Sequence, residues 1–261
     1  MTTNTSNKVA IVTGEFSGIG RATAERLAAA GYDLVLVARR KERLDQLASA
    51  LRVTERIVSV VDGDLANPDT AQDAVSAAID MSGRLDVLIN AAGLMLIGDS
   101  VQQPADEWER MIDVNLRGLM HLTKAALPRL LGTAAEGGGP TDVVNVRSVA
   151  GRVVAANTAV YTATKFAVTA ATDAWRQEYA GTGLRFSVVE PGFVDTELGS
   201  FQDSTQAFYD QMASEQDILH PDDVASVIEY IITRPARLPS TRSSSAPPIS
   251  NKTGSGTGSV G

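Results

Sequence analysis

A tyrosine and a lysine four residues apart form the first pair in this sequence whose spacing could support chemistry. Tyr161 and Lys165 lie in a stretch with helical periodicity, where this separation places two side chains on one face, one turn apart. A phenol titrates near 10 in water and is a poor base at neutral pH, but a nearby ammonium favours the phenolate. Lowering the phenol pKa to about 7 requires about 4 kcal/mol, which the ammonium and a second positive charge could supply. The pair could exchange a proton with an alcohol or carbonyl oxygen, although the same spacing also arises by chance.

Two further polar residues have positions that suit a reaction site. Ser148 follows an apolar run and precedes Tyr161 by thirteen residues. At the carboxyl edge of a parallel sheet, where open α/β folds bind ligands, its hydroxyl could polarise a substrate carbonyl; alternatively, it caps a turn. Asn115 stands inside a helical pattern. Because asparagine is a poor helix former, we expect it to kink the helix or to bind a water molecule there.

The turn after the first apolar run is rich in glycine. Gly14, Gly18 and Gly20 allow the backbone to approach a pyrophosphate, whose charge would meet the N–H groups at the start of the next helix. The spacing G-x-x-x-G-x-G is not the more common G-x-G-x-x-G, and a turn without a ligand is the alternative. Arg39 and Arg40 end the second apolar run, where a guanidinium can hold a 2′-phosphate. The sequence therefore favours NADP(H) over NAD(H).

The elements that would position these residues alternate along the chain. Short apolar runs alternate with helical patterns, which predicts β-α-β units and a doubly wound parallel sheet of the α/β class, covered on both faces. One Rossmann-type domain at 1–235, with a lid near 195–220, accounts for this pattern. No strand is evident after residue 235, and the residues from 236 to 261, mostly Ser, Thr, Gly and Pro, predict a disordered tail. The predicted strands are 9–12, 34–37, 57–61, 87–89, 143–146 and 186–189, and the predicted helices are 21–30, 40–52, 67–78, 105–131 and 160–179.

Composition excludes several classes of function. The chain has 261 residues, with 23 Lys and Arg against 31 Asp and Glu, a net charge of −8. Phosphate backbones need a basic face, so nucleic acid is not an expected partner. With no cysteine and two histidines, no metal site is expected. No stretch resembles a signal peptide or a membrane span, so we expect a cytoplasmic protein that does not bind membranes.

Taken in order over residues 8–235, these motifs resemble the short-chain dehydrogenase/reductase family, in its compact group. The segments 110–116 and 189–192 are most similar to NADP-dependent reductases of the clavulanic acid dehydrogenase type. The resemblance implies that Tyr161 is the acid/base and that Lys165 lowers its pKa and binds the nicotinamide ribose. Ser148 would orient the carbonyl, and Asn115 would hold a water linked to Lys165. The implied cofactor contacts are Gly14, Phe16, Ser17, Gly18, Ile19, Gly20, Arg39, Arg40, Asp64, Leu65, Asn90, Ala91, Ala92, Gly93, Tyr161, Lys165, Pro191, Gly192, Val194 and Thr196.

The resemblance implies an NADP(H)-dependent oxidoreductase that transfers a hydride between nicotinamide and a ketone or aldehyde, or the corresponding alcohol. It also implies a homodimer or homotetramer built through the helices near 105–131 and 160–179. The alternative is a catalytically impaired NADP(H)-binding sensor or interaction module of the same fold. The apolar segment 94–97 could line a pocket for a moderately hydrophobic substrate, or could be ordinary packing.

Four positions depart from the family pattern. Glu15 and Phe16 stand where family members have small residues; the carboxylate would oppose a pyrophosphate, and the ring could cover the adenosine ribose. Ala91 replaces a second asparagine that is thought to brace the sheet. Arg147 replaces a serine beside Ser148 and would add positive charge near the site. Glu15, Ala91 and the missing seventh strand are the features that favour the sensor alternative.

Overall fold

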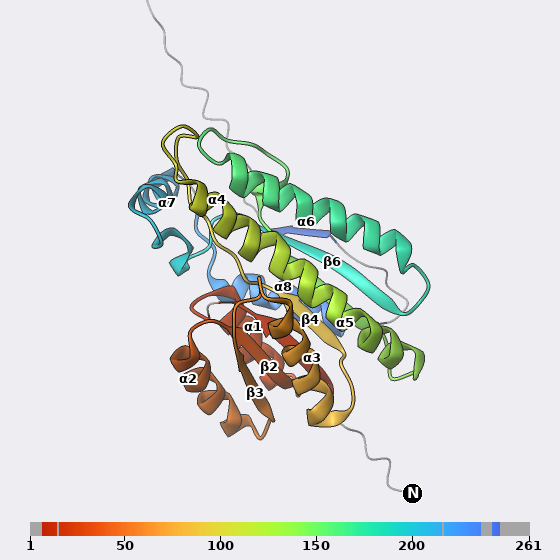
Figure 1. Ribbon diagram of the computed structural model, residues 1–261. Coiled ribbons are helices and arrows are strands. Elements are labelled where there is room, and N and C mark those ends of the chain that lie inside the picture. The colour runs from red at the N-terminus through yellow and green to blue at the C-terminus, as the bar shows by residue number, and fades with distance from the viewer. Residues whose placement is uncertain (1–6, 15, 216, 236–241, 246–261) are drawn as a thin grey trace, which may run out of the picture.

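Seven parallel strands form one sheet through the centre of the molecule (Figure 1). The computed structural model describes residues 7–14, 16–215, 217–235 and 242–245. The strand order is β3-β2-β1-β4-β5-β6-β7, so the chain starts in the middle, runs outward to β3 and returns to place β4 beside β1. The predicted doubly wound α/β fold is confirmed. The strands are β1 (Val9–Thr13), β2 (Asp33–Ala38), β3 (Val58–Asp62), β4 (Val87–Asn90), β5 (Thr141–Val146), β6 (Leu184–Pro191) and β7 (Arg242–Ser245).

Local sequence signals set where α3 begins and ends. α3 begins at Pro68 behind Asn67, whose side chain accepts a hydrogen bond from the Asp69 N–H at 3.0 Å, and it ends before Gly83 at φ +74°. The predicted helix at 105–131 consists of two α-helices joined by a π-helical turn, and α7 and α8 lie outside the predicted helices. The helices are α1 (Ile19–Ala29), α2 (Lys41–Leu51), α3 (Pro68–Ser82), α4 (Ala105–Ile112), the π-helical turn η2 (Asp113–Arg117), α5 (Gly118–Ala135), α6 (Ala159–Glu178), α7 (Asp203–Glu215) and α8 (Pro221–Thr233), with short 3₁₀ turns η1 (Arg52–Thr54), η3 (Val149–Gly151) and η4 (Glu197–Gly199).

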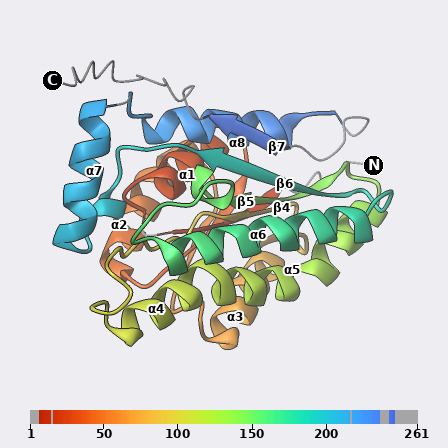
Figure 2. The same ribbon diagram turned by 90° about the horizontal axis from the view of Figure 1, so that it is seen from above.

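Helices cover both faces of the sheet, and alternate residues of a strand serve the two faces. On one face, Ala10 and Val12 of β1 pack with residues of α1, α2 and α8. On the other face, Val9 and Ile11 pack with residues of α3 and α5. Figure 2 shows α5 and α6 on one side of the sheet and α1 and α8 on the other. Because both faces are buried, the strands appear in the sequence as continuous apolar runs.

Residues 195–218 leave the sheet and return to the point of departure. Val194 pairs with Leu219 in an isolated parallel bridge. The Asp195 N–H donates to the Leu219 carbonyl, and the Leu219 N–H donates to the Phe193 carbonyl, both at 2.9 Å. Between these joined ends lie η4 and α7, and α7 stands at one end of the molecule in both views (Figures 1 and 2). The predicted lid near 195–220 coincides with this excursion.

Four residues beyond the predicted end of the domain form a seventh strand. Residues 242–245 of β7 pair in parallel with residues 188–191 of β6. The prediction that no strand follows residue 235 is wrong for these four, because backbone hydrogen bonds to a neighbouring strand hold an edge strand without apolar side chains. The rest of the predicted disordered tail lies outside the described residues. None of the helices in the described ranges combines the length and the apolar character needed to cross a membrane.

Candidate active site

A cavity opens at the carboxyl edge of the sheet, where β1, β4 and β5 end side by side. The register aligns Thr13 with Asn90 and Asn90 with Asn145, so the residues that follow these three strands meet there. The topology reverses between β1 and β4, which is the position at which doubly wound sheets bind ligands. The lining residues are Gly14, Phe16, Ser17, Gly18, Ile19, Gly20, Ala91, Ala92, Gly93, Val146, Arg147, Tyr161, Lys165, Thr196, Glu197, Leu198 and Phe201.

Tyr161 and Lys165 line this cavity from the first two turns of α6. Both residues are buried, with 4% and 5% of their surface exposed, and Lys165 Nζ lies 5.5 Å from the centre of the Tyr161 ring. The helix thus places the phenol and the ammonium one turn apart on the same face, as their spacing predicts.

The Tyr161 phenol is neutral at pH 7 in the chain without a cofactor. Burial raises the pKa of Tyr161 to about 12, and a hydrogen bond with Ser148 opposes this rise. Loss of phenolate hydration thus dominates in the chain alone, and the predicted lowering of this pKa by Lys165 together with the charge of an oxidised nicotinamide stays a prediction. Ser148 also caps η3, where its hydroxyl accepts a hydrogen bond from the Ala150 N–H at 3.2 Å. The two roles considered for Ser148, a turn cap and a partner of the reacting groups, are therefore compatible.

Arg147 places a second positive charge beside Lys165. Its fully buried side chain pairs with the fully buried Glu190, with Nε donating to Oε1 at 3.1 Å, and Glu190 also pairs with Arg152. Burial and, after it, the charge of Arg147 lower the pKa of Lys165 to about 8. A Cβ on Gly151 would collide with Arg147 Nη1, so the guanidinium occupies space that only glycine leaves open.

Asn115 joins three elements around the same point. It lies in the π-helical turn η2, so the prediction that it disturbs its helix is confirmed. Its Oδ1 accepts from the Leu94 N–H at 2.7 Å, and its Nδ2 donates to the Leu94 carbonyl at 2.8 Å and to Thr164 Oγ1 at 3.2 Å. These bonds hold the segment after β4 against α6. A Cβ on Gly93 would lie 3.6 Å from Lys165 Nζ and 3.8 Å from Asn115 Oδ1, so Gly93 adjoins both groups.

The glycine turn connects this cavity to a second one. Gly14 has φ +148°, and a Cβ on Gly20 would lie 3.1 Å from the Thr13 carbonyl oxygen, so both positions favour glycine. Thr13 Oγ1 accepts hydrogen bonds from the Ala91 and Ala92 N–H groups at 3.1 and 3.2 Å, which fixes the strand-end segment after β4. The second cavity is lined by Gly14, Val37, Ala38, Arg39, Gly63, Asp64, Leu65, Ala92 and Val114.

Comparison with known proteins identifies the family. The family model for short chain dehydrogenases matches residues 8–207. The chain belongs to the short-chain dehydrogenase/reductase family.

Relatives of this short-chain dehydrogenase share nearly its whole length. An uncharacterised oxidoreductase of Staphylococcus aureus strain MW2 is 34% identical over 233 residues, which cover 89% of this chain and 94% of the relative. A short-chain dehydrogenase/reductase from Burkholderia phymatum, solved in complex with NAD, has a TM-score of 0.80 and 27% identity, covering 91% of this chain and 89% of that one. Serine dehydrogenase in a closed form complexed with NADP⁺ has a TM-score of 0.82 and 26% identity, covering 92% and 94%. These matches support the family and not the clavulanic acid dehydrogenase subgroup.

Most of the residues that the resemblance assigns to the cofactor line one of the two cavities of the short-chain dehydrogenase. Asn90 does not: its Nδ2 donates to Asn145 Oδ1 of β5 at 2.8 Å and to Thr123 Oγ1 of α5 at 3.3 Å, so the side chain is buried between the sheet and α5. Val194 is 5% exposed and packs in the core, and Arg40 pairs with Glu197. Pro191 and Gly192 also lie outside the two linings.

Several lining residues were not predicted from the sequence. Their common signal is position, because most of them end a strand or directly follow one at the carboxyl edge of the sheet. Three others belong to the excursion after β6, and Val114 lies in the π-helical turn η2. The residues missed are Val37, Ala38, Gly63, Val114, Val146, Arg147 as a lining residue, Glu197, Leu198 and Phe201.

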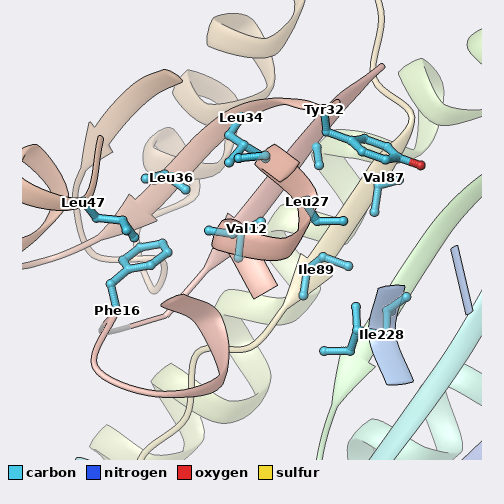
Figure 3. Packing of buried hydrophobic residues seen from close by; sticks show 14 of the residues in the cluster. Val12, Phe16, Leu27, Tyr32, Leu34, Leu36, Leu47, Val87, Ile89 and Ile228 are labelled. Atoms are coloured by element: carbon cyan, nitrogen blue, oxygen red, sulfur yellow. The ribbon is translucent and has the colours of Figure 1, made fainter. Parts of the chain in front are cut away.

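Phe16 has two environments in the short-chain dehydrogenase. It lines the main cavity, yet it is 5% exposed and belongs to the core cluster of α1, α2 and α8. Figure 3 shows its ring beside Leu47 of α2, with Leu36 of β2 nearby. The residue has φ +50°, a left-handed conformation that is unusual for an aromatic residue. Burial of the ring among leucine side chains compensates for the strain of this backbone conformation, so the packing of Phe16 stabilises the glycine turn.

Proposed function

We propose that this chain transfers a hydride between NADP(H) and a ketone or aldehyde, or the corresponding alcohol, with Tyr161 exchanging the proton at oxygen. The proposal depends on one observation, the meeting of Tyr161, Lys165, Ser148 and Asn115 around the end of the cleft that begins at the glycine turn. A protein that only binds a dinucleotide has no need for a buried phenol, ammonium and amide at this point.

The residues around the two cavities fit a nicotinamide dinucleotide. Gly14 and Ala92 line both cavities, so the two adjoin each other at the glycine turn. Tyr161 and Lys165 lie at one end, where the nicotinamide would bind, and Asp64 lines the other, where the adenine would bind. The bare backbone of the turn would face the pyrophosphate. When bound, the nicotinamide would supply or accept the hydride.

The chain's own residues manage the proton. With a pKa of about 12, the Tyr161 phenol remains protonated at neutral pH and can donate to the oxygen of a carbonyl that is being reduced. Ser148 can donate a hydrogen bond to the same oxygen. Lys165, with a pKa of about 8, exchanges protons readily near neutral pH and can return one to Tyr161. In the direction of alcohol oxidation, the positive charges of Lys165 and of an oxidised nicotinamide favour the phenolate.

Arginine at the end of β2 supports the choice of NADP(H). Arg39 lines the second cavity, where a 2′-phosphate on the adenosine ribose would find a guanidinium rather than a carboxylate. Arg39→Ala should weaken NADPH binding by roughly tenfold or more and NADH binding much less, since a charge-assisted hydrogen bond contributes about 1.5–3 kcal/mol. The matched control is Arg56→Ala, because Arg56 precedes β3 at the opposite edge of the sheet. Equal losses for the two cofactors would contradict the proposal.

The substrate side of the site is apolar and aromatic. The segment 94–97 after β4 packs in one buried cluster with Tyr161, against Leu198, Phe201 and Tyr209 of the excursion 195–218. This environment favours a moderately hydrophobic ketone or aldehyde whose carbonyl lies near Tyr161. The assignment to clavulanic acid dehydrogenase-type reductases, which rests on the sequence resemblance alone, is likewise a proposal.

The direct test is a panel of carbonyl compounds with NADPH oxidation followed by absorbance. Tyr161→Phe should lower turnover by at least about 100-fold, the usual contribution of a general acid, while NADPH binding stays nearly unchanged. Tyr230→Phe, which removes the same atom from a residue that is 63% exposed, should behave as the wild-type chain. Unaltered turnover in Tyr161→Phe would remove Tyr161 from the mechanism. NADPH binding with no turnover across the panel would favour the sensor alternative.

We also propose that the chain assembles as a homodimer or homotetramer through the helices near 105–131 and 160–179, which are α4, α5 and α6. Ile112 of α4 and Phe166 of α6 are 38% and 42% exposed, although both are large and apolar. Burial against a second copy would remove this surface from water. Sedimentation equilibrium of the wild-type chain and of Phe166→Glu tests the proposal; a wild-type monomer would contradict it.

A further inference from the structure

Glu197 forms an ion-paired bridge across the cofactor cleft. Its Oε2 accepts hydrogen bonds from Arg43 Nη1 at 2.7 Å and from Arg40 Nη2 at 3.4 Å. We call these three residues the Glu197 bridge. Arg40 directly precedes α2, two residues after the end of β2, whereas Glu197 is the first residue of η4 after β6. In the sheet, β1, β4 and β5 separate β2 from β6, so the bridge spans the carboxyl edge above the glycine turn.

The segment that carries Glu197 rests directly on that turn. A Cβ on Gly18 would lie only 2.5 Å from Thr196 Cγ2, so the side chain before Glu197 fills the space that the glycine leaves. Glu197 lines both the main cavity and a neighbouring cavity of about 420 Å³. The neighbouring cavity is also lined by Ser17, Arg21, Arg43 and Gln46, so it lies between the glycine turn with α1 and the helix α2 that follows β2.

The partners of Glu197 are those that a phosphate monoester prefers. Guanidinium groups bind carboxylates and phosphates with the same forked geometry, and a phosphate brings up to two negative charges where a carboxylate brings one. The pKa of Glu197 lies below its ordinary value because Arg43, and after it Arg40, stabilise the carboxylate, so the bridge is ionised at neutral pH. The side chains of Glu197, Arg43 and Arg40 are 41%, 36% and 34% exposed, which leaves them accessible to a competing anion.

We propose that Glu197 occupies the guanidinium site of the 2′-phosphate of NADP(H) and acts as a built-in competitor that reduces the preference of the chain for NADP(H) over NAD(H). This inference rests on the proposed function, in which the dinucleotide lies along the glycine turn. A 2′-phosphate that Arg39 binds at the end of β2 would also meet Arg40, the next residue in the chain, and it must displace the carboxylate from Arg40 and Arg43 to bind them. A cofactor with a ribose hydroxyl leaves the bridge closed. When the Glu197 carboxylate is displaced, η4 and the start of the excursion 195–218 also lose their ion-paired link to Arg40 and Arg43, which follow β2.

Two nucleotide fragments that differ only in the relevant group provide the test. Adenosine 2′,5′-bisphosphate and adenosine 5′-monophosphate are titrated into the cofactor-free chain by calorimetry. Glu197→Gln keeps the size of the side chain and removes its charge. It should tighten binding of the bisphosphate by about two- to fivefold, the range of an exposed ion pair, and leave the monophosphate unchanged. Glu197→Ala should shift the bisphosphate in the same direction.

The control variant is Glu229→Gln, which removes the same charge from a residue paired with Arg26 between α1 and α8. It should alter neither affinity, and a matching gain in this variant would assign the effect to net charge and overturn the inference. An unchanged ratio of the two affinities in Glu197→Gln, or weaker bisphosphate binding, would also overturn it.

The same titrations separate this inference from the proposed cofactor. The wild-type ratio tests NADP(H) preference, and the change of that ratio in Glu197→Gln tests the bridge. A wild-type chain that binds both fragments equally, combined with a Glu197→Gln chain that prefers the bisphosphate, would refute NADP(H) preference and support the bridge. A wild-type preference for the bisphosphate that Glu197→Gln leaves unchanged would support NADP(H) preference and refute the role of the bridge.

Discussion

Replacing Lys165 should change how the stability of the chain depends on pH. Lys165 is 5% exposed, and its pKa falls from 10.5 to about 8 because burial and the charge of Arg147 disfavour the ammonium. Since the folded pKa lies below the unfolded one, the unfolded chain binds more protons between these two values, and stability rises with pH across that window. Below pH 8 the full penalty applies, about 3 kcal/mol at about 1.4 kcal/mol per pKa unit.

The measurable part of this penalty lies below pH 10. With the two pKa values of Lys165, the penalty falls from about 3 kcal/mol at pH 7 to about 1 kcal/mol at pH 9.5, a gain in stability of about 2 kcal/mol. Tyr161 has a raised folded pKa of about 12, so its contribution is fully present below 10, the unfolded value, and is lost only as pH rises toward 12. The window from pH 7 to 9.5 therefore isolates Lys165 from Tyr161.

Urea unfolding of the cofactor-free chain at pH 7 and 9.5 provides the assay, at equal protein concentrations. Between these pH values the wild-type chain should gain about 2 kcal/mol more than Lys165→Met, because methionine carries no proton to lose. Lys124→Met, at an exposed position of α5, should follow the wild-type curve. If wild-type and Lys165→Met stabilities change in parallel, Lys165 is not a buried ammonium with a lowered pKa, and its assigned part in proton return fails.

Three further predictions concern packing, a buried ion pair and the substrate pocket. Gly151→Ala should lower the unfolding free energy by about 1–3 kcal/mol, because the new Cβ collides with Arg147 Nη1 and lies 2.9 Å from the Lys165 carbonyl oxygen. In the Arg147→Ser background, where the first of these clashes is absent, the same substitution should cost less, and an equal cost in both backgrounds would contradict this cause. Asp142→Asn should lower the free energy of unfolding in urea by about 3–5 kcal/mol, because the buried Arg185 loses the carboxylate that accepts its hydrogen bonds at 2.7 and 2.8 Å. The control, Asp45→Asn in the exposed ion pair with Lys41, should cost under about 1 kcal/mol. Similar losses in the two variants would contradict the expected difference between a buried and an exposed ion pair. Tyr209→Ala should raise the KM of bulky apolar ketones more than it lowers kcat. The reason is that the Tyr209 ring packs against Phe193, with 5.3 Å between the ring centroids, and against Gly199 beside the pocket. A loss confined to kcat would assign Tyr209 a different role.

The residues that could be predicted are those whose signal is local. The spacing of Tyr161 and Lys165 fixes their common face on any helix, and the poor helix propensity of Asn115 indicated the disturbance that the structure shows as a π-helical turn. The continuous apolar runs identified six strands, because a sheet buried on both faces imposes that pattern. The positions of the strand ends then predicted that the cleft lies at the carboxyl edge of the sheet.

The rest depends on contacts between distant segments. Arg43 and Glu197 are 154 residues apart in the chain, and no pattern near either of them indicates the other. The Asn90 amide lies between the sheet and α5 because Asn145 and Thr123 accept its hydrogen bonds, and these contacts depend on the register of β4 with β5 and on the packing of α5. Strand β7 was missed because its pairing with β6 uses backbone N–H and C=O groups, which are common to nearly all residues and leave no pattern in the sequence.

The bridge between Val194 and Leu219 has a consequence for how this enzyme scaffold could diversify. Since the chain enters and leaves the excursion at neighbouring backbone positions, the intervening segment can vary in length and side chains while the strand register stays intact. The residues proposed to handle the proton lie just after β5, in η2 and in α6, outside that segment. Grafting the corresponding stretch of another short-chain dehydrogenase between these two positions would therefore exchange the walls of the pocket and keep the chemistry at its floor.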